Sequence, residues 1–238
     1  MKNSIQDILK HQLPGITAQQ RLSPSNRTAQ DSKWDLSKVK NSSVLIMLYL
    51  KEGEWYFPLI QRASYNGAHS GQVSLPGGKW EPEDNNPWDT AVRETREEIG
   101  VKDVIEYIGA ITPLYIPFSN YMVYPYIGIS NVQHDFHIDT VEVNELIEAP
   151  LVDLLNQNYG NLKTFSFYHH QEQVTAPYFD INGYCVWGAT AMILSEFSEV
   201  MHLRNKNTTD SLHSYNAHIS QESLSRTGKA LHPDNNQI

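Results

Sequence analysis

Three glutamates, Glu94, Glu97 and Glu98, are spaced so that a helix would place them on one face. Like charges this close repel one another, and the repulsion grows where the face lines a pocket. A cation among them would relieve it, and carboxylates with no cysteine nearby suit a hard divalent ion, Mg2+ or Mn2+. The alternative is a solvated acidic face with Arg93 and Arg96 as ion-pair partners.

The residues around the glutamates predict a single capped helix. Asn86 is a favourable N-cap, Pro87 suits the first helical position, and Gly100 can take the left-handed conformation that ends a helix. Other side chains recur at helical spacing and form a mostly apolar stripe for packing against a core: Trp88, Ala91, Val92, Thr95 and Ile99.

The whole segment, residues 77–101 (GGKWEPEDNNPWDTAVRETREEIGV), resembles the Nudix box, G-x5-E-x7-R-E-U-x-E-E-x-G-U, where U is apolar. Its second half, residues 93–101, matches the pattern, with Thr95 at an apolar position. A match this long and position-specific favours the metal-binding interpretation of the glutamates over the solvated face.

The first half of the box departs from the general spacing. Counting back from Arg93 puts Lys79 and Asn85 where the pattern has Gly and Glu. Aligning Gly78 and Asp84 instead needs one extra residue before Arg93. This longer spacing, with Asp in place of Glu, is similar to the coenzyme A pyrophosphatase branch of the family.

A second motif precedes the box. Residues 59–78 resemble the additional motif of coenzyme A pyrophosphatases, L-L-T-x-R-[SA]-x3-R-x3-G-x3-F-P-G-G. Gly67 occupies the place of the second Arg, which removes a planar phosphate donor, and Leu75 occupies that of Phe. His69 or Lys79 could supply charge nearby. The positions that fit are Arg62, Ala63, Gly71, Pro76, Gly77 and Gly78.

The resemblance implies roles for individual residues. The divalent ions would be held by Glu94, Glu97 and Glu98 and by a backbone carbonyl at Gly78. Arg93 would pair with a box carboxylate and hold the catalytic turn of the helix in register. The general base would be Glu94 or a loop carboxylate such as Glu142. The residues expected to bind substrate are Arg62, Gly77, Gly78 and Lys79.

The reaction implied is metal-dependent hydrolysis of a diphosphate bond, with coenzyme A or acyl-coenzyme A giving 3′,5′-ADP and (acyl-)4′-phosphopantetheine. Two alternatives stay open. The substrate could be another nucleotide, such as ADP-ribose, a dinucleotide or an oxidised nucleotide, because the second Arg is missing. The fold could also serve as a non-catalytic ligand-binding regulatory module, although such modules usually lose box carboxylates, and this chain retains three.

Charge and composition narrow the partners. The chain has a formal net charge of −9, and residues 41–202 carry 7 Lys and Arg against 21 Asp and Glu, which argues against a nucleic-acid partner. The single cysteine, Cys185, excludes an internal disulfide, and the longest apolar run, residues 44–50, is too short to span a bilayer. We expect a cytoplasmic protein with a small nucleotide-derived diphosphate as substrate, no membrane partner, and a possible homodimer contact.

The remaining sequence predicts an α/β fold in which a mixed sheet lies between helices, and the resemblance implies the same Nudix-type α/β/α sandwich. Residues 1–40 are expected to form an N-terminal arm with a short helix over 3–10 and irregular structure from Leu13 to Lys40. Residues 41–202 are expected to form the domain, and residues 203–238 a polar, disordered tail. Strands are expected at 44–50 and 55–60 as a hairpin, then at 73–75, 104–114, 122–129, 164–169, 174–180 and 184–187, with helices at 146–155 and 189–201. Pro125 indicates that the strand at 122–129 is an edge or carries a bulge.

Overall fold

A computed structural model describes residues 1–11, 13–25, 27, 38–63, 71–132, 134–157, 161–167 and 172–206. Gly67 and His69 of the second motif, and residues 207–238 of the expected tail, lie outside the described residues. Residues 203–206 continue the closing helix, which spans 188–206.

The main sheet is built around β1 (Lys40–Lys51), which pairs antiparallel with β2 (Glu54–Arg62) and parallel with β7 (Tyr121–Ser130). The strand order is β3-β2-β1-β7-β5, with β4 beside β1, β6 beside β7 and β8 beside β2. Parallel and antiparallel pairs in one sheet confirm the expected mixed topology, and the predicted hairpin is β1–β2. The other strands are β3 (Val73–Ser74), β4 (Gly77–Lys79), β5 (Glu106–Ala110), β6 (Leu114–Ile116) and β8 (Val143–Pro150).

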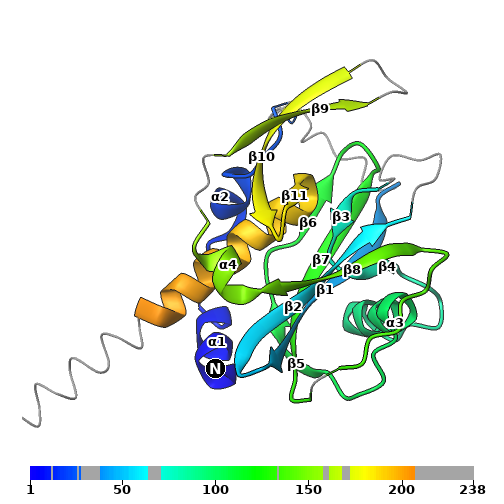
Figure 1. The fold of residues 1–238 in the computed structure, drawn as a ribbon, viewed down its shortest axis with the longest axis vertical. Helices are drawn as coiled ribbons and strands as arrows, with labels where there is room; N and C mark the ends of the chain where they lie inside the picture. Colours follow the sequence, from blue (N-terminus) through cyan, green and yellow to red (C-terminus); the bar gives the residue numbers. More distant parts are fainter. Residues whose placement is uncertain are drawn as a thin grey trace, which may run out of the picture.

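Helices cover both faces of this sheet (Figure 1). Side chains of β1 alternate: Leu45 and Met47 face α3 (Pro87–Ile99), whereas Ile46 and Leu48 join the core on the opposite face. That opposite core also receives α1 (Lys2–Leu9), α4 (Leu151–Leu155) and the closing helix. The α/β/α sandwich expected from the sequence is therefore present.

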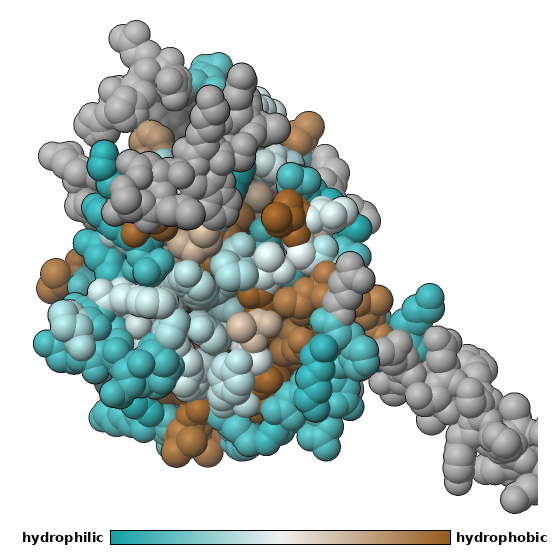
Figure 2. All heavy atoms as spheres, turned by 180° about the vertical axis from the view of Figure 1, so that it is seen from behind, coloured by the Kyte–Doolittle hydropathy of each residue, from teal (hydrophilic) through white to brown (hydrophobic). Residues whose placement is uncertain are grey.

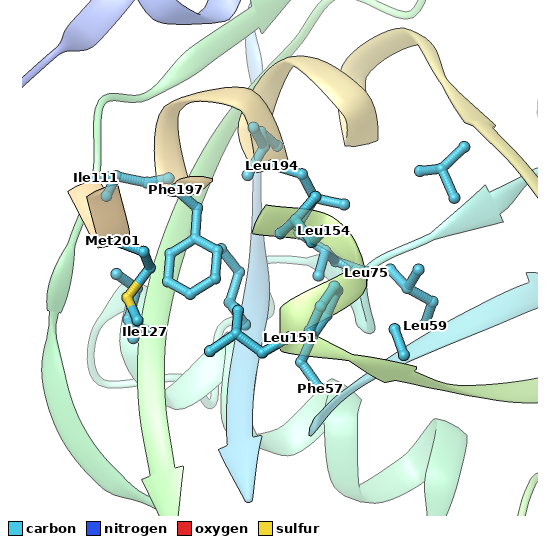
Figure 3. Packing of buried hydrophobic residues seen from close by; sticks show 14 of the residues in the cluster. Phe57, Leu59, Leu75, Ile111, Ile127, Leu151, Leu154, Leu194, Phe197 and Met201 are labelled. Carbon is cyan, nitrogen blue, oxygen red and sulfur yellow. The ribbon is translucent and has the colours of Figure 1, made fainter. Parts of the chain in front are cut away.

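The closing helix fills the core opposite α3. Figure 3 shows Leu194, Phe197 and Met201 of this helix directed into the same apolar cluster as Leu151 and Leu154 of α4. All five side chains are buried, so the closing helix is part of the core of the domain. The amphipathic helix predicted at 189–201 is confirmed.

A second, three-stranded sheet consists of β9 (Leu162–Phe167), β10 (Glu172–Ile181) and β11 (Tyr184–Trp187), in the order β11-β10-β9. Both of its pairings are antiparallel, and its three strands correspond to those predicted at 164–169, 174–180 and 184–187. Phe165 and Trp187 stack across β10 with their ring centroids 4.1 Å apart.

The N-terminal arm is more ordered than expected. The predicted first helix is α1, which buries Ile5 and Ile8, but the expectation of irregular structure after Leu13 is wrong for α2 (Gly15–Gln20). This six-residue helix is too short to be stable alone, and its sequence shows no sustained period. It is held from outside, since Ser195 of the closing helix donates a hydrogen bond to the Ala18 carbonyl at 2.7 Å.

The strand predicted at 104–114 is wrong as one element, because residues 111–113 separate β5 from β6. Pro125 is not on an edge strand, since β7 lies between β1 and β5/β6. Pro125 lies opposite the interruption between β5 and β6, and its carbonyl accepts a hydrogen bond from the Ile111 amide at 3.2 Å. A residue without an N–H is tolerated where the neighbouring ladder is broken.

The helix predicted at 146–155 is wrong in its first half. Residues 146–150 belong to β8 and pair with β2, and the helix α4 starts only after Pro150. The fixed φ of proline suits the position before a helix, and local pattern alone does not distinguish a strand from a helix over so few residues.

The surface on the side opposite to the view of Figure 1 is mixed in polarity: Figure 2 shows separate brown hydrophobic areas among teal hydrophilic ones. Within the described part of the chain, no helix is both long and apolar enough to cross a bilayer.

Candidate active site

The helix α3 begins and ends as the sequence predicts. The Asn86 side chain accepts hydrogen bonds from the amides of Trp88 at 3.0 Å and Asp89 at 3.1 Å, and Gly100 takes φ +73° at the C-cap. Ala91, Thr95 and Ile99 are fully buried, and Trp88 and Val92 pack against the same core. The Thr95 hydroxyl donates to the Ala91 carbonyl at 2.7 Å, which lets a polar residue replace an apolar one.

The strand β4 lies directly against α3, and two glycines make this possible. Gly77 has φ +149°, and a Cβ added to it would lie 2.2 Å from the Ser43 carbonyl oxygen. A Cβ added to Gly78 would lie 2.2 Å from the Glu94 carboxyl carbon. Gly77 therefore has a backbone conformation that favours glycine, and Gly78 makes a close approach that a side chain would obstruct.

Arg93 ties this strand, the loop and the helix together. Its Nε and Nη2 each donate to the Asp84 carboxylate at 3.0 Å, and Nη2 also donates to the Lys79 carbonyl at 3.0 Å. Its Nη1 donates to both Glu94 and Glu97 at 3.0 Å. The hydrogen bonds from Arg93 hold the pKa of Asp84 well below its usual range.

These contacts decide between the two alignments of the box. Asp84, not Asn85, receives the paired hydrogen bonds of Arg93, and Gly78, not Lys79, makes the close approach to Glu94. The longer spacing is therefore the structural one. Asp84 is a site residue that the sequence assignment of roles omits, and the extra residue before Arg93 is the signal that identifies it.

Glu98 is the most buried of the three glutamates, with 2% of its side chain exposed. Its Oε2 accepts a hydrogen bond from the Gly77 amide at 2.8 Å, and its Oε1 accepts one from Nη1 of Arg62 at 3.3 Å. Burial, together with the smaller effects of the charges of Glu94 and Glu142, raises the pKa of Glu98 to about 8. The Gly77 amide and the Arg62 guanidinium oppose this rise only in part.

The other two glutamates differ from each other. Burial raises the pKa of Glu94, the neighbouring charge of Arg93 lowers it in part, and the charges of Glu97 and Glu142 add to the rise. The side chain of Glu94 is 14% exposed, whereas that of Glu97 is 58% exposed. The structure thus brings Glu94 and Glu98 together at the β4 side of α3 and leaves Glu97 at the rim.

The donor atoms present fit a hard divalent cation in their chemistry. They are carboxylate and carbonyl oxygens. The charge of Glu142 raises the pKa of both Glu94 and Glu98, and the charge of Glu94 raises that of Glu98, a repulsion that a bound cation would relieve. Their arrangement is not a closed cage: within the described ranges, no three His, Cys, Asp or Glu side chains are close enough together to hold a metal ion. Arg93 stands between Glu94 and Glu97.

The loop between β7 and β8 carries Glu142 to the same place. The Asp139 amide donates to the Glu98 carbonyl at 2.9 Å, and the Ala63 amide donates to the Glu142 carbonyl at 2.9 Å. Glu145 and Glu148, expected in a loop or helix end, are instead on β8. Glu148 accepts hydrogen bonds from the Tyr49 hydroxyl at 2.7 Å and the Lys51 ammonium at 2.8 Å.

Two relatives from curated proteins are similar over most of the domain. "Nudix hydrolase 15, mitochondrial" of Arabidopsis thaliana is 33% identical over 178 residues, covering 71% of this chain and 61% of its own. The human "Mitochondrial coenzyme A diphosphatase NUDT8" is 33% identical over 144 residues, covering 58% of this chain and 59% of its own. This chain thus spans about 60% of the length of each. Both names specify mitochondria, so the cytoplasmic location stays a prediction.

A solved structure with a similar fold is the NUDIX domain of Shewanella oneidensis NrtR in complex with ADP ribose, at 19% identity and a TM-score of 0.42, covering 56% of this chain and 84% of its own. The family model described as the NUDIX domain matches residues 39–176, which is more than half of the chain and includes α3, β4 and every site residue named above. The chain that places Glu94 against Gly78 and Glu98 against Gly77 belongs to the Nudix family.

Proposed function

We propose that this protein is a metal-dependent hydrolase of a diphosphate bond in a nucleotide derivative. The observation that carries the proposal is Glu98, a carboxylate 2% exposed, placed beside Glu94 under the close approach of Gly78. Burying two like-charged groups together costs stability, so a role outside folding accounts for them better than a structural one.

Glu94, Glu97, Glu98 and the Gly78 carbonyl are the groups that would hold Mg2+ or Mn2+. A bound ion supplies charge neutralisation on the phosphates and activation of a water molecule. Nη1 of Arg93 contacts Glu94 and Glu97, and these two contacts would give way to the ion. The bonds of Nε and Nη2 to Asp84 and the Lys79 carbonyl would still hold α3 against β4. Glu94 or Glu142 accepts the proton of the attacking water.

Coenzyme A or an acyl-coenzyme A is the proposed substrate, giving 3′,5′-ADP and (acyl-)4′-phosphopantetheine. Two observations support it: the motif of residues 59–78, whose Arg62 lies at the site, and the similarity to a relative named as a coenzyme A diphosphatase. Arg62 and the exposed Lys79 are the proposed contacts to the phosphates.

A second candidate keeps the chemistry and changes the substrate to another nucleotide, such as ADP-ribose or a dinucleotide. The observation in its favour is Gly67, which stands where the coenzyme A motif has a second Arg. A non-catalytic ligand-binding module is the least favoured alternative, because Glu94, Glu97 and Glu98 are all retained.

A product screen tests these proposals. The full chain is incubated with coenzyme A, an acyl-coenzyme A, ADP-ribose and NADH, each with Mg2+, with Mn2+ or with a chelator, and products are separated by chromatography. We expect 3′,5′-ADP from coenzyme A to form fastest, and only with metal. Faster cleavage of ADP-ribose or NADH would select the second candidate. Binding of any of these compounds without cleavage would favour the non-catalytic module.

A further inference from the structure

Arg62 is turned toward the site by an irregularity in the sheet. The pairing of β2 with β8 shifts register between Gln61 and Arg62, so that Arg62 lies opposite Val143. Such bulges commonly redirect a side chain beside a functional site. The Arg62 side chain is 26% exposed, so it lies at the boundary between the buried carboxylate of Glu98 and solvent.

The two arginines of the site are held very differently. Arg93 uses Nε, Nη1 and Nη2, and it contacts Asp84, Glu94, Glu97 and a backbone carbonyl, all at 3.0 Å. In the part of the chain that the structure describes, the guanidinium of Arg62 has one carboxylate partner, reached by Nη1 alone at 3.3 Å. The single long hydrogen bond of Arg62 therefore costs far less to break than the several hydrogen bonds of Arg93.

The hydrogen bond from Arg62 falls on Oε1 of Glu98, an oxygen that a divalent cation could also bind. Each oxygen of Glu98 accepts one hydrogen bond, Oε2 a short one from the Gly77 amide at 2.8 Å and Oε1 a longer one from Arg62 at 3.3 Å, so Oε1 is the oxygen whose partner is more easily displaced. A cation that binds Oε1 therefore competes with Arg62 for it. A bound divalent ion brings two positive charges where Arg62 brings one, so the electrostatic balance favours the ion.

We propose that Arg62 is an exchangeable counter-ion of Glu98. It donates to Oε1 while no divalent ion is bound, yields this oxygen to the ion, and then directs its guanidinium to a phosphate of the substrate. This inference rests on the proposed function. It makes metal binding a precondition for strong substrate binding, because the same guanidinium cannot serve Glu98 and a phosphate with its full set of donors at once.

The exchange predicts effects of opposite sign when Arg62 is removed. An Arg62→Met variant lacks the competitor for Glu98, so it binds Mn2+ more tightly, by about three- to tenfold. The same variant lacks the phosphate donor, so with saturating Mn2+ it binds 3′,5′-ADP at least about tenfold more weakly. A residue that merely supported the fold of the site would weaken both.

The first measurement is Mn2+ binding, followed at one fixed pH by the loss of the free-ion signal in electron paramagnetic resonance. Arg21→Met is the matched control, because it removes the same charge from a pair with Glu199, formed with the closing helix on the other side of the sheet. This control should bind Mn2+ like the parent chain. Arg62→Lys, which keeps the charge, should also stay close to the parent.

The second measurement is calorimetric binding of 3′,5′-ADP, with and without Mn2+. The parent chain should bind it more tightly with Mn2+, and Arg62→Met should lose most of that gain. Arg62→Gln serves as a second neutral variant if Arg62→Met does not unfold cooperatively at the temperature of the parent. Mn2+ binding that is unchanged or weaker in a folded neutral variant overturns the exchange.

The metal titration requires no turnover, so the two proposals fail separately. Tighter Mn2+ binding by Arg62→Met supports the exchange even if none of the screened substrates is cleaved. Cleavage of coenzyme A by the parent chain, together with unchanged Mn2+ affinity in the variant, supports the proposed function and overturns the exchange.

Discussion

Two buried glutamates on opposite sides of the main sheet show how differently one residue type is used. Glu196 of the closing helix is 0% exposed, and its oxygens accept hydrogen bonds from the Gly15 amide, the Thr112 amide and hydroxyl, and the Gln19 side chain, at 2.7–3.3 Å. Glu98 of α3 is 2% exposed and accepts one amide and one long guanidinium contact, with Glu94 and Glu142 close enough to raise its pKa.

Burial alone therefore does not mark a functional carboxylate. Glu196 has neutral donors from two separate segments, and these hydrogen bonds join α2 and the β5–β6 connection to the closing helix. Glu98 is left with fewer donors and with like charges nearby, and this imbalance is what a divalent cation would correct. Glu196 and Glu98 thus differ in the groups that surround their carboxylates. Substitutions at the two positions should therefore separate an effect on function from an effect on stability.

The largest expected effect is on catalysis. Glu98→Gln should reduce metal-dependent hydrolysis by about 10²- to 10³-fold, because it removes a negative oxygen ligand while keeping the shape of the side chain. Turnover of coenzyme A with Mg2+ is the measurement, and chemical unfolding should show a fold at least as stable as that of the parent. Unchanged turnover in Glu98→Gln would refute the ligand role. Glu196→Gln, the same substitution at the other buried carboxylate, is the matched control.

The next effect is on the pH dependence of stability without metal. The pKa of Glu98 is about 8 in the folded chain, against an ordinary value of 4.5. The folded state therefore keeps a proton that the unfolded state releases, so the unfolding free energy should fall as pH rises from about 4.5 to about 8. The fall is on the order of 5 kcal/mol, because the two pKa values lie about 3.5 units apart and each unit corresponds to about 1.4 kcal/mol.

Urea unfolding at a series of pH values, with a chelator present, measures this slope. Glu98→Gln should lose most of it, because the variant has no proton to release at that position. Saturating Mn2+ should also flatten the slope, since the ion takes the place of the proton. A slope of the same size in the variant would assign the effect to other groups, of which Glu94, whose pKa is also raised, is the first to examine.

The smallest of these effects is on folding at the other side of the sheet. Glu196→Gln replaces acceptor oxygens by an amide group that cannot satisfy the surrounding donors, so it should lower the unfolding free energy by about 2–3 kcal/mol. Turnover per folded molecule should stay close to that of the parent. A loss of turnover comparable to that of Glu98→Gln, in a folded sample, would contradict the separation of the two carboxylates.

The helix and the helix face that carry Glu98 can be predicted from the sequence, whereas the hydrogen-bond partners of Glu196 cannot. Glu98 belongs to a segment whose start and stop signals, Asn86 and Gly100, act locally, so its helix and its face can be derived from spacing. Glu196 lies in a helix pattern like any polar residue, and its donors come from Gly15 and Thr112, far away in the chain. Only the tertiary fold brings them together.

The same distinction explains the errors. The strand over residues 146–150 exists because β2 pairs with it, and Pro125 is tolerated in a central strand because its neighbour is interrupted. Neither partner can be inferred from the local sequence. Within the site, Asp84 could be identified only by choosing the longer spacing, and the partner of Arg93 decides that choice.

The connection between β7 and β8 has a consequence for how the length of this chain can vary. The His137 and Asp139 amides donate to the Ile99 and Glu98 carbonyls at the end of α3, and four residues after Asp139 the chain enters β8, which pairs with β2 next to Arg62. A length change within residues 137–143 would displace a proposed metal ligand and its counter-ion together. Insertions should be accepted earlier in this connection, and loops exchanged from related chains should keep this short segment at its native length.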